Sequence, residues 1–191
     1  MKLFKDLYAY RELLKNNVKK DVRGKYKGSF LGVLWTFMNP LLMTLVYAIV
    51  FPHLMKSATY EHYTTFLIIG ILAWNWFGQC ISQGTYSVLW NGGIIKKVYF
   101  PREILPISVV TSGLINYLIT LVIIAIFLIC SGIGFNICMV WLPLIIVTQY
   151  FLTLGIIFIT SALNVYARDL EYFVSFFTQM LFYATPILYS I

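Results

Sequence analysis

WNGGIIKKVYFPREILP, residues 90–106, is a short basic segment between two long uncharged apolar segments. The chain has no Asp, Glu, Lys or Arg at residues 62–95 or at residues 104–167. A membrane-spanning helix needs about 20 predominantly apolar residues, so both flanking segments are predicted to lie in a membrane. Lys96, Lys97 and Arg102, opposed only by Glu103, place the segment on the cytoplasmic side, where loops carry an excess of Lys and Arg.

The composition of residues 90–106 also favours a docking surface. Asn91-Gly92-Gly93 is expected to end the preceding helix, residues 94–100 to form one or two amphipathic turns, and Pro101 and Pro106 to mark the start of the next span. Adjacent isoleucines, lysines and aromatic residues favour contact with another protein. Composition leaves one alternative open, in which the lysines only fix the topology and the aromatic residues only lie at the membrane interface.

The overall composition predicts an all-α integral membrane protein. Of 191 residues, 60% are hydrophobic and 11% are charged, and the mean hydropathy is +0.82. No globular fold of this length could bury so much apolar surface. Nine of the 14 Lys and Arg residues fall in residues 1–27 with three acidic residues, which predicts a cytoplasmic N-terminus facing anionic lipid rather than a nucleic-acid partner.

A single transmembrane domain over residues 1–191 is predicted, with a cytoplasmic amphipathic N-terminus at 1–27. Residues 2–22 place apolar side chains on one helical face, which is typical of a helix lying on the inner leaflet. Five spans are then expected, at about 29–51, 63–90, 107–131, 139–163 and 172–191. Asn39-Pro40 in the first span predicts a kink, which could serve either as a hinge or as a packing feature.

The second predicted span is the most polar. Amide and hydroxyl residues recur along one side of it, with aromatic residues among them, and such groups are disfavoured against lipid. They therefore either line a polar path or form hydrogen bonds between helices. The candidates for a channel lining are Trp74, Asn75, Gln79, Gln83 and Tyr86.

Several kinds of chemistry are not predicted for this chain. No predicted span contains Asp, Glu, Lys, Arg or His, which disfavours ion-coupled transport. Neither a catalytic constellation nor a glycine-rich phosphate loop is present. The His53, Glu61 and His62 group has no metal-site spacing, and of three cysteines only Cys130 and Cys138 could lie close together. We therefore expect no enzyme activity, metal or cofactor in this chain. If the protein moves a substrate, the energy is expected to come from another protein chain.

Three motifs together resemble a known family. They are Arg23 with Tyr26-Lys27-Gly28-Ser29-Phe30-Leu31-Gly32, Trp35 and Asn39-Pro40; residues 95–106; and Asn164-Val165-Tyr166-Ala167-Arg168-Asp169-Leu170. In this order and at these spacings the chain resembles the permease subunits of type-two ABC exporters, in the branch that exports polysaccharide, O-antigen or teichoic acid. The resemblance covers essentially all 191 residues.

The resemblance implies the partners. It implies a homodimer of six-span permeases in the bacterial cytoplasmic membrane, in contact with membrane lipid and a lipid-linked glycan, on two ABC ATPase subunits that bind ATP and Mg²⁺. It also implies that the loop at 95–106 couples the permease to the ATPase. The residues assigned to this loop are Ile95, Lys96, Lys97, Tyr99, Phe100, Arg102 and Glu103. Because only five spans are predicted, a sixth is expected to be missing, through a fragmentary sequence or a truncated product.

Two other classes remain open at this stage. One is a type-two ABC exporter of lipids or drugs, and the other is a truncated membrane protein that does not transport. Arg168 and Asp169 form a cytoplasmic charge pair in sequence, but adjacent residues do not face one another on a helix. Each is therefore expected to pair elsewhere, for example Asp169 with the basic N-terminal segment.

Overall fold

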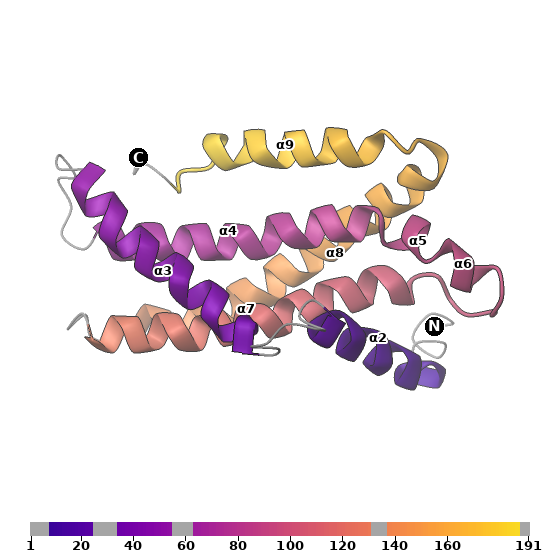
Figure 1. The fold of residues 1–191 in the computed structure, drawn as a ribbon, viewed down its shortest axis with the longest axis horizontal. Helices are drawn as coiled ribbons and strands as arrows, with labels where there is room; N and C mark the ends of the chain where they lie inside the picture. The colour runs from indigo at the N-terminus through magenta and orange to yellow at the C-terminus, as the bar shows by residue number, and fades with distance from the viewer. Residues whose placement is uncertain (1–7, 25–33, 55–62, 131–136, 188–191) are drawn as a thin grey trace.

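The computed structural model describes residues 8–24, 34–54, 63–130 and 137–187 (Figure 1). Within these residues the fold is entirely helical, which confirms the all-α prediction. The longer helices are α2 (Arg11–Gly24), α3 (Trp35–Leu54), α4 (Tyr63–Thr85), α7 (Ile104–Cys130), α8 (Leu142–Tyr166) and α9 (Leu170–Ala184). The short ones are α5 (Ser87–Trp90), α6 (Gly92–Ile95) and the 3-10 helix η2 (Ile137–Trp141).

Three segments of the described chain are long and apolar enough to cross a membrane: Thr65–Thr85, Ile104–Ile126 and Met139–Tyr166. They match the second, third and fourth predicted spans. Helix α3 has 20 residues and continues through Asn39-Pro40. Helix α9 has 15 residues, about 22 Å at 1.5 Å per residue, which is shorter than a hydrocarbon core of about 30 Å. Five complete crossings therefore stay a prediction.

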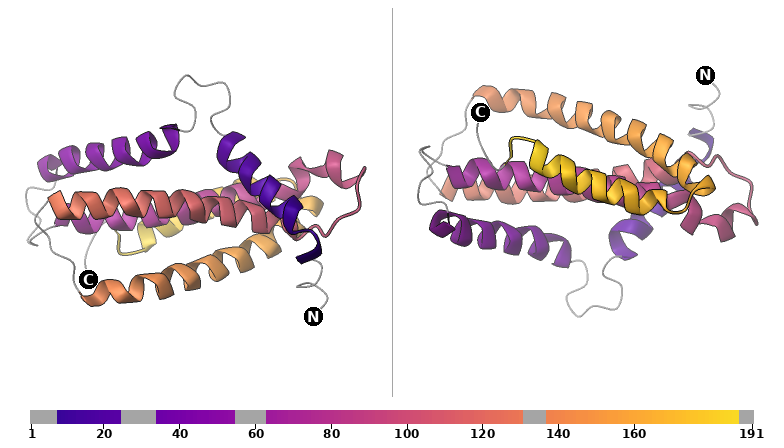
Figure 2. Two further views of the ribbon diagram at one scale, coloured as in Figure 1. Left: turned by 90° about the horizontal axis from the view of Figure 1, so that it is seen from below. Right: turned by 90° about the horizontal axis from the view of Figure 1, so that it is seen from above.

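Helix α4 lies at the centre of the bundle, with α3, α7, α8 and α9 packed around it (Figures 1 and 2). Two glycines let its neighbours approach closely. A Cβ atom added to Gly84 would lie 2.5 Å from Ile157 of α8, and one added to Gly113 of α7 would overlap Cys80 of α4. Small residues at such contacts are the usual means of packing membrane helices.

The core between α4, α7 and α8 is apolar and partly aromatic. Trp76, Cys80, Val110, Tyr117 and Ile157 form one buried cluster. The rings of Trp76 and Tyr117 stack with centroids 4.6 Å apart and planes 10° from parallel. The outward faces of α7 and α8 are also apolar, as exposed Val122 and Phe151 illustrate. Apolar faces on both sides are expected of helices that separate a protein core from lipid.

Helix α4 ends at Thr85, before the predicted end of the second span at about residue 90, and Tyr86 after it has φ −94° and ψ 2°. The hydroxyl of Thr85 donates to the carbonyl of Ile81 at 2.8 Å and also lies 3.0 Å from the hydroxyl of Thr160 on α8. Ser87 donates to the carbonyl of Gly84 at 2.7 Å. Side-chain hydroxyls that bond to carbonyls of the preceding turn bend helices. These two hydroxyl groups lie on either side of the break.

The turns predicted for residues 94–100 begin earlier than expected. The carbonyl of Asn91 accepts hydrogen bonds from the N–H groups of both Ile94 and Ile95, at 3.0 Å each. Gly92 and Gly93 consequently belong to helix α6 instead of separating two helices, and residues 99 and 100 are not helical. Asn91 itself does end α5, as predicted.

The amphipathic helix α2 packs against protein. Leu13 and Leu14 near the start of α2, with Tyr10 just before the helix, pack against a buried cluster. The cluster consists of Phe100, Ile104 and Leu105. Further along, Leu14, Val18 and Val22 line a groove of 430 Å³ with Thr111 and Ile115 of α7. The sequence predicted an interfacial helix, and the structure adds that its apolar face is anchored on α7.

Candidate functional site

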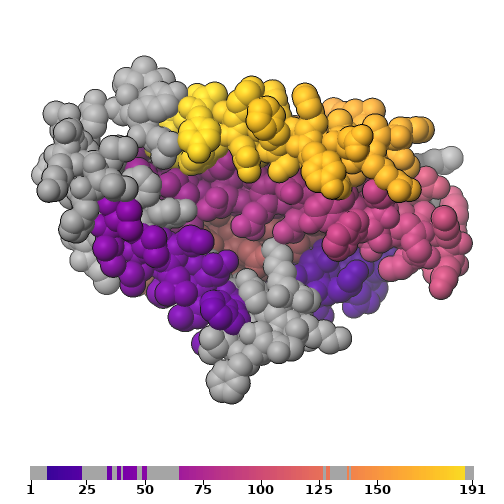
Figure 3. Space-filling model, turned by 45° about the horizontal axis from the view of Figure 1, so that its top comes forward, coloured from indigo at the N-terminus to yellow at the C-terminus, as the bar shows by residue number. Residues whose placement is uncertain are grey.

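An elongated cavity of 880 Å³ lies between α4 and α9. The space-filling view shows α9 lying along α4 (Figure 3). All five side chains predicted to line a channel face this cavity: Trp74, Asn75, Gln79, Gln83 and Tyr86. Helix α4 also contributes Ile71, Gly78 and Ser82. The three- to four-residue spacing of these positions puts them on one face of α4, so the sequence pattern and the cavity coincide.

Helix α9 supplies the opposite wall, which the sequence-based site did not include. Its lining residues are Ser175, Thr178, Gln179, Phe182 and Tyr183. They follow the same three- to four-residue spacing as the polar face of α4. This periodicity is visible in the sequence, and it could have identified α9 as the second polar helix.

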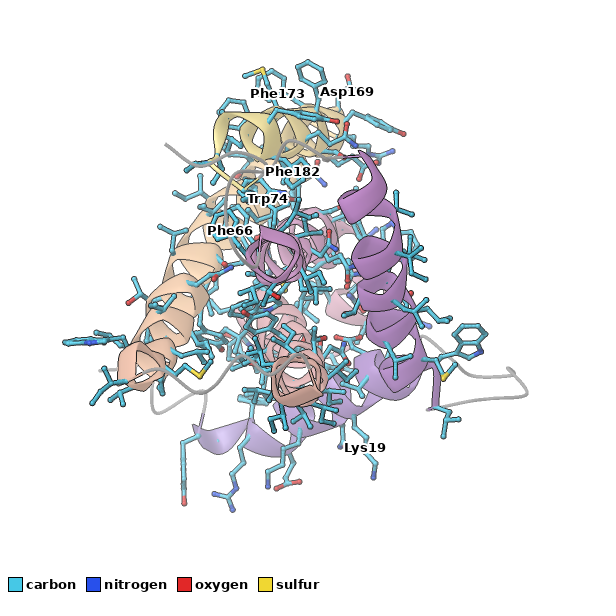
Figure 4. The ribbon with its side chains drawn as sticks, turned by 90° about the vertical axis from the view of Figure 1, so that its left-hand side faces the viewer. Lys19, Phe66, Trp74, Asp169, Phe173 and Phe182 are labelled. Atoms are coloured by element: carbon cyan, nitrogen blue, oxygen red, sulfur yellow. The ribbon has the colours of Figure 1, made fainter. Side chains whose placement is uncertain are left out.

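Aromatic rings alternate with the amides along the cavity. Trp74 and Phe182 lie between α4 and α9, with ring centroids 5.8 Å apart (Figure 4). Tyr86 and Trp90 form a second pair at 5.1 Å, at the end of α4 where the helix breaks. Aromatic faces offer broad apolar contact, and the phenol and indole groups keep a polar edge.

The amides facing the cavity do not hold helices together in the described part of the chain. There, the side-chain amides of Asn75, Gln79, Gln83 and Gln179 form no hydrogen bond to another described residue. Polar contacts between helices occur on other faces, from Thr85 to Thr160, from Thr111 to Tyr150 at 3.0 Å, and from Gln149 to the carbonyl of Ala73 at 3.3 Å. This distribution favours the polar-path interpretation over interhelical bonding.

The loop assigned to coupling divides into an anchor and an exposed surface. Phe100 is only 8% exposed and packs with Ile104 and Leu105, and Ile95 borders the same cluster. Tyr99 is 93% exposed. The other assigned residues of the loop, Lys96, Lys97, Arg102 and Glu103, are also exposed. The surface available to a partner is therefore formed by Tyr99 and the charged residues, and Phe100 holds the loop against α7 and α2.

Arg168 and Asp169 are exposed at the turn between α8 and α9. The carbonyl of Asp169 accepts hydrogen bonds from the N–H groups of Tyr172 and Phe173, at 3.2 and 3.3 Å. Figure 4 places Asp169 and Lys19 on opposite sides of the bundle, because α9 and α2 flank different helices. The described part of the N-terminal segment therefore does not form the ion pair expected for Asp169.

Among the residues that the structure describes, no group of three His, Cys, Asp or Glu residues is arranged to hold a metal ion. The side chains of His53, Glu61, His62, Cys130 and Cys138 lie outside the described set. The predictions made for them are therefore not tested by this structure.

Long apolar helices, a cavity lined by amides and aromatic rings between α4 and α9, and an exposed basic loop at one end are together features of an integral membrane protein. The chain belongs to the ABC-2 type transporter family, whose model matches residues 12–191. It is therefore a transport permease and not an enzyme.

Two curated relatives have a description that is narrower than the family name. The chain is 39% identical over 180 residues to the O-antigen export system permease protein RfbA of Klebsiella pneumoniae, covering 94% of this chain and 69% of that protein. It is 35% identical over 191 residues to the protein of the same description from Myxococcus xanthus, covering 100% of this chain and 73% of the relative.

Proposed function

We propose that this chain is the membrane-spanning subunit of an ATP-driven exporter that moves a lipid-linked cell-surface polysaccharide across the bacterial cytoplasmic membrane. Family membership supports the permease role, and the relatives' description as O-antigen export permeases favours a glycan over a drug or a simple lipid. The single observation that carries the proposal is the cavity between α4 and α9, lined by amides, hydroxyls and aromatic rings.

This lining suits the passage of sugars. A hydrated sugar can exchange hydrogen bonds with amides such as Asn75, Gln79 and Gln83, which otherwise have no partner among the described residues. The apolar faces of sugar rings can contact Trp74 and Phe182. Contacts that are broad but individually weak allow a long polymer to move without being trapped, since conduction requires that each site also release what it binds.

The energy comes from a separate ABC ATPase subunit, which we expect to bind ATP and Mg²⁺ and to contact the exposed part of the loop at 95–106. The loop, the start of α7 and the end of α8 lie at the same end of the bundle (Figure 1). We place this end and the N-terminus in the cytoplasm because of their basic residues. A second copy of the chain is proposed to complete the channel, with membrane lipid around the outer apolar faces.

The path can be tested by thiol labelling. Single cysteines at Gln79, Gln83 and Tyr86, in a variant lacking the native cysteines, are expected to react with a small water-soluble thiol reagent because these side chains face the cavity. A cysteine at Ile81 is the matched control on the same helix, since that side chain is 4% exposed in the core. A cysteine at Val122, which is 60% exposed on an apolar face, controls for a lipid-facing position.

Both controls are expected to stay largely unmodified, and labelling can be followed by the mass of the purified protein. Equally weak labelling at Gln79, Gln83 and Tyr86 in an actively transporting complex would contradict a hydrated path along α4. The amides would then serve only to associate helices.

The docking loop can be tested with Tyr99→Ala. Tyr99 is 93% exposed, so its removal should leave thermal unfolding unchanged and weaken binding of the ATPase. Truncating a well-placed aromatic interface residue typically costs about tenfold in affinity. The readout is the amount of ATPase that co-purifies with the permease at several salt concentrations.

Phe100→Ala is a poorer test, because it also removes a buried side chain from the cluster with Ile104 and Leu105. Val98→Ala, at a 56% exposed neighbouring position, is the matched control for an exposed apolar truncation. Unchanged ATPase recovery with Tyr99→Ala would remove Tyr99 from the docking surface.

A further inference from the structure

Glu171 lies on α9, one turn before the first residue of that helix that lines the cavity between α4 and α9. It belongs to the first turn of α9, and Ser175, Thr178 and Phe182, which line the cavity, follow at four, seven and eleven residues along the helix. This spacing puts Glu171 on the same face as the lining residues, one turn beyond the last of them.

The charge of Glu171 acts on the opposite wall. Burial raises the pKa of the Tyr86 phenol, and the nearby Glu171 carboxylate raises it further. Tyr86 lines the cavity where α4 breaks, so the Glu171 carboxylate lies near that end of the cavity.

The described lining of the cavity is uncharged. Its thirteen residues are aromatic, amide, hydroxyl, glycine or apolar residues. The cationic groups at the same end of the molecule lie elsewhere. Arg102 lines a separate cavity of 340 Å³ with Glu103 and Tyr166, and Lys96, Lys97 and Arg168 are exposed at turns between helices. Of the described charged residues, Glu171 is the one on the cavity face of α9.

We propose that Glu171 makes this path selective for uncharged glycans over polyanionic polymers such as poly(glycerol phosphate), the backbone chemistry of teichoic acids. The inference rests on the proposed function, and it narrows the substrate class. A negative charge at the mouth of a low-dielectric passage repels a phosphate at every repeat of a polyanion. A neutral sugar experiences no such repulsion, and its hydroxyl groups can donate hydrogen bonds to the carboxylate.

The test uses the permease reconstituted in proteoliposomes with its ATPase. Two probes are compared on the same lipid carrier, an oligomer of neutral hexoses and an oligomer of glycerol phosphate of similar length. The measured quantity is the ratio of their transport rates. Glu171→Gln is expected to raise the relative rate of the phosphate oligomer by about fivefold, the factor given by one unit charge at contact distance in water. Raising the salt concentration should reduce the wild-type discrimination, since such interactions are screened.

Glu12→Gln is the matched control, because it removes a carboxylate from exposed α2, on the other side of the bundle. It is expected to keep the wild-type ratio. Equal transport of both probes by the wild type, or a ratio unchanged by Glu171→Gln, would overturn the selectivity. Transport of neither probe by the wild type would overturn the proposed function itself, so the two failures are distinguishable.

Discussion

Gly113→Leu is expected to abolish recovery of folded permease from membranes. A Cβ atom at this position would overlap the sulfur of Cys80 and lie 3.2 Å from Nε1 of Trp76. These neighbours belong to the buried cluster between α4 and α7, so they have little room to move. Even modest overpacking of a core costs about 1–3 kcal/mol, and a leucine adds three further carbon atoms beyond the Cβ.

Gly84→Leu should act in the same way at the contact of α4 with α8, where Ile157 would lie 2.5–2.8 Å from the new Cβ atom. The measurement is the yield of monodisperse protein after mild detergent extraction, followed by thermal unfolding of whatever is recovered. Gly155→Leu is the matched control, because no atom lies within 4 Å of a Cβ placed there.

Normal yield and unfolding temperature for Gly113→Leu would mean that α7 and α4 pack less closely than described. A matching loss for Gly155→Leu would instead show that any leucine in these spans impairs insertion. The two glycine contacts therefore test the placement of α4 at the centre of the bundle.

The parts of the fold that depend on composition were predictable. The segment from 104 to 167 without a charged residue predicted two membrane spans, and α7 and α8 have the length and apolar composition that such spans need. The polar face of α4 was also visible in the sequence, because amides that recur every three to four residues fall on one face of a helix. Both signals are local and periodic, so a single sequence is enough to detect them.

Features that depend on contacts between distant residues could not be predicted. Thr85, at the end of α4, contacts Thr160, which lies 75 residues further along the chain. Tyr99 and Phe100 are adjacent and aromatic, yet one is exposed and the other is buried because α2 covers the loop from one side only. No periodicity distinguishes two neighbours in an irregular segment. The same limit applied to Asp169, because the described part of its predicted partner, the basic N-terminal segment, lies on the other side of the bundle.

The candidate site between α4 and α9 depends both on local periodicity in the sequence and on contacts between residues far apart in the chain. The five residues of α4 proposed from the sequence as a channel lining all face the cavity, whereas the facing residues of α9 were not among the candidates taken from the sequence. The pairing gives the cavity its chemistry, since Gln179 faces the amides of α4 and Phe182 pairs with Trp74. An obstruction placed between these walls should therefore affect transport more than stability.

Gly78→Phe is expected to reduce glycan export to below about one tenth of the wild-type rate while the permease remains folded, because a bulky ring would occupy the path. Gly78 lines the cavity, and a Cβ atom there would meet Thr178 at an ordinary 3.5 Å and Trp74 at 3.9 Å. The new side chain can thus enter the cavity without overlapping the core. Glycine is also a poor helix former, so its replacement within α4 should not lower the unfolding temperature.

Gly155→Phe, at the open position on α8, is the matched control and should export at the wild-type rate. The readouts are glycan transport in proteoliposomes, thermal unfolding and the amount of co-purified ATPase. Export by Gly78→Phe at the wild-type rate, with the protein folded and the ATPase bound, would exclude the space between α4 and α9 as the route of the polymer. Loss of export together with loss of the ATPase would indicate a disturbed assembly, and only loss of export with the ATPase retained supports a blocked path.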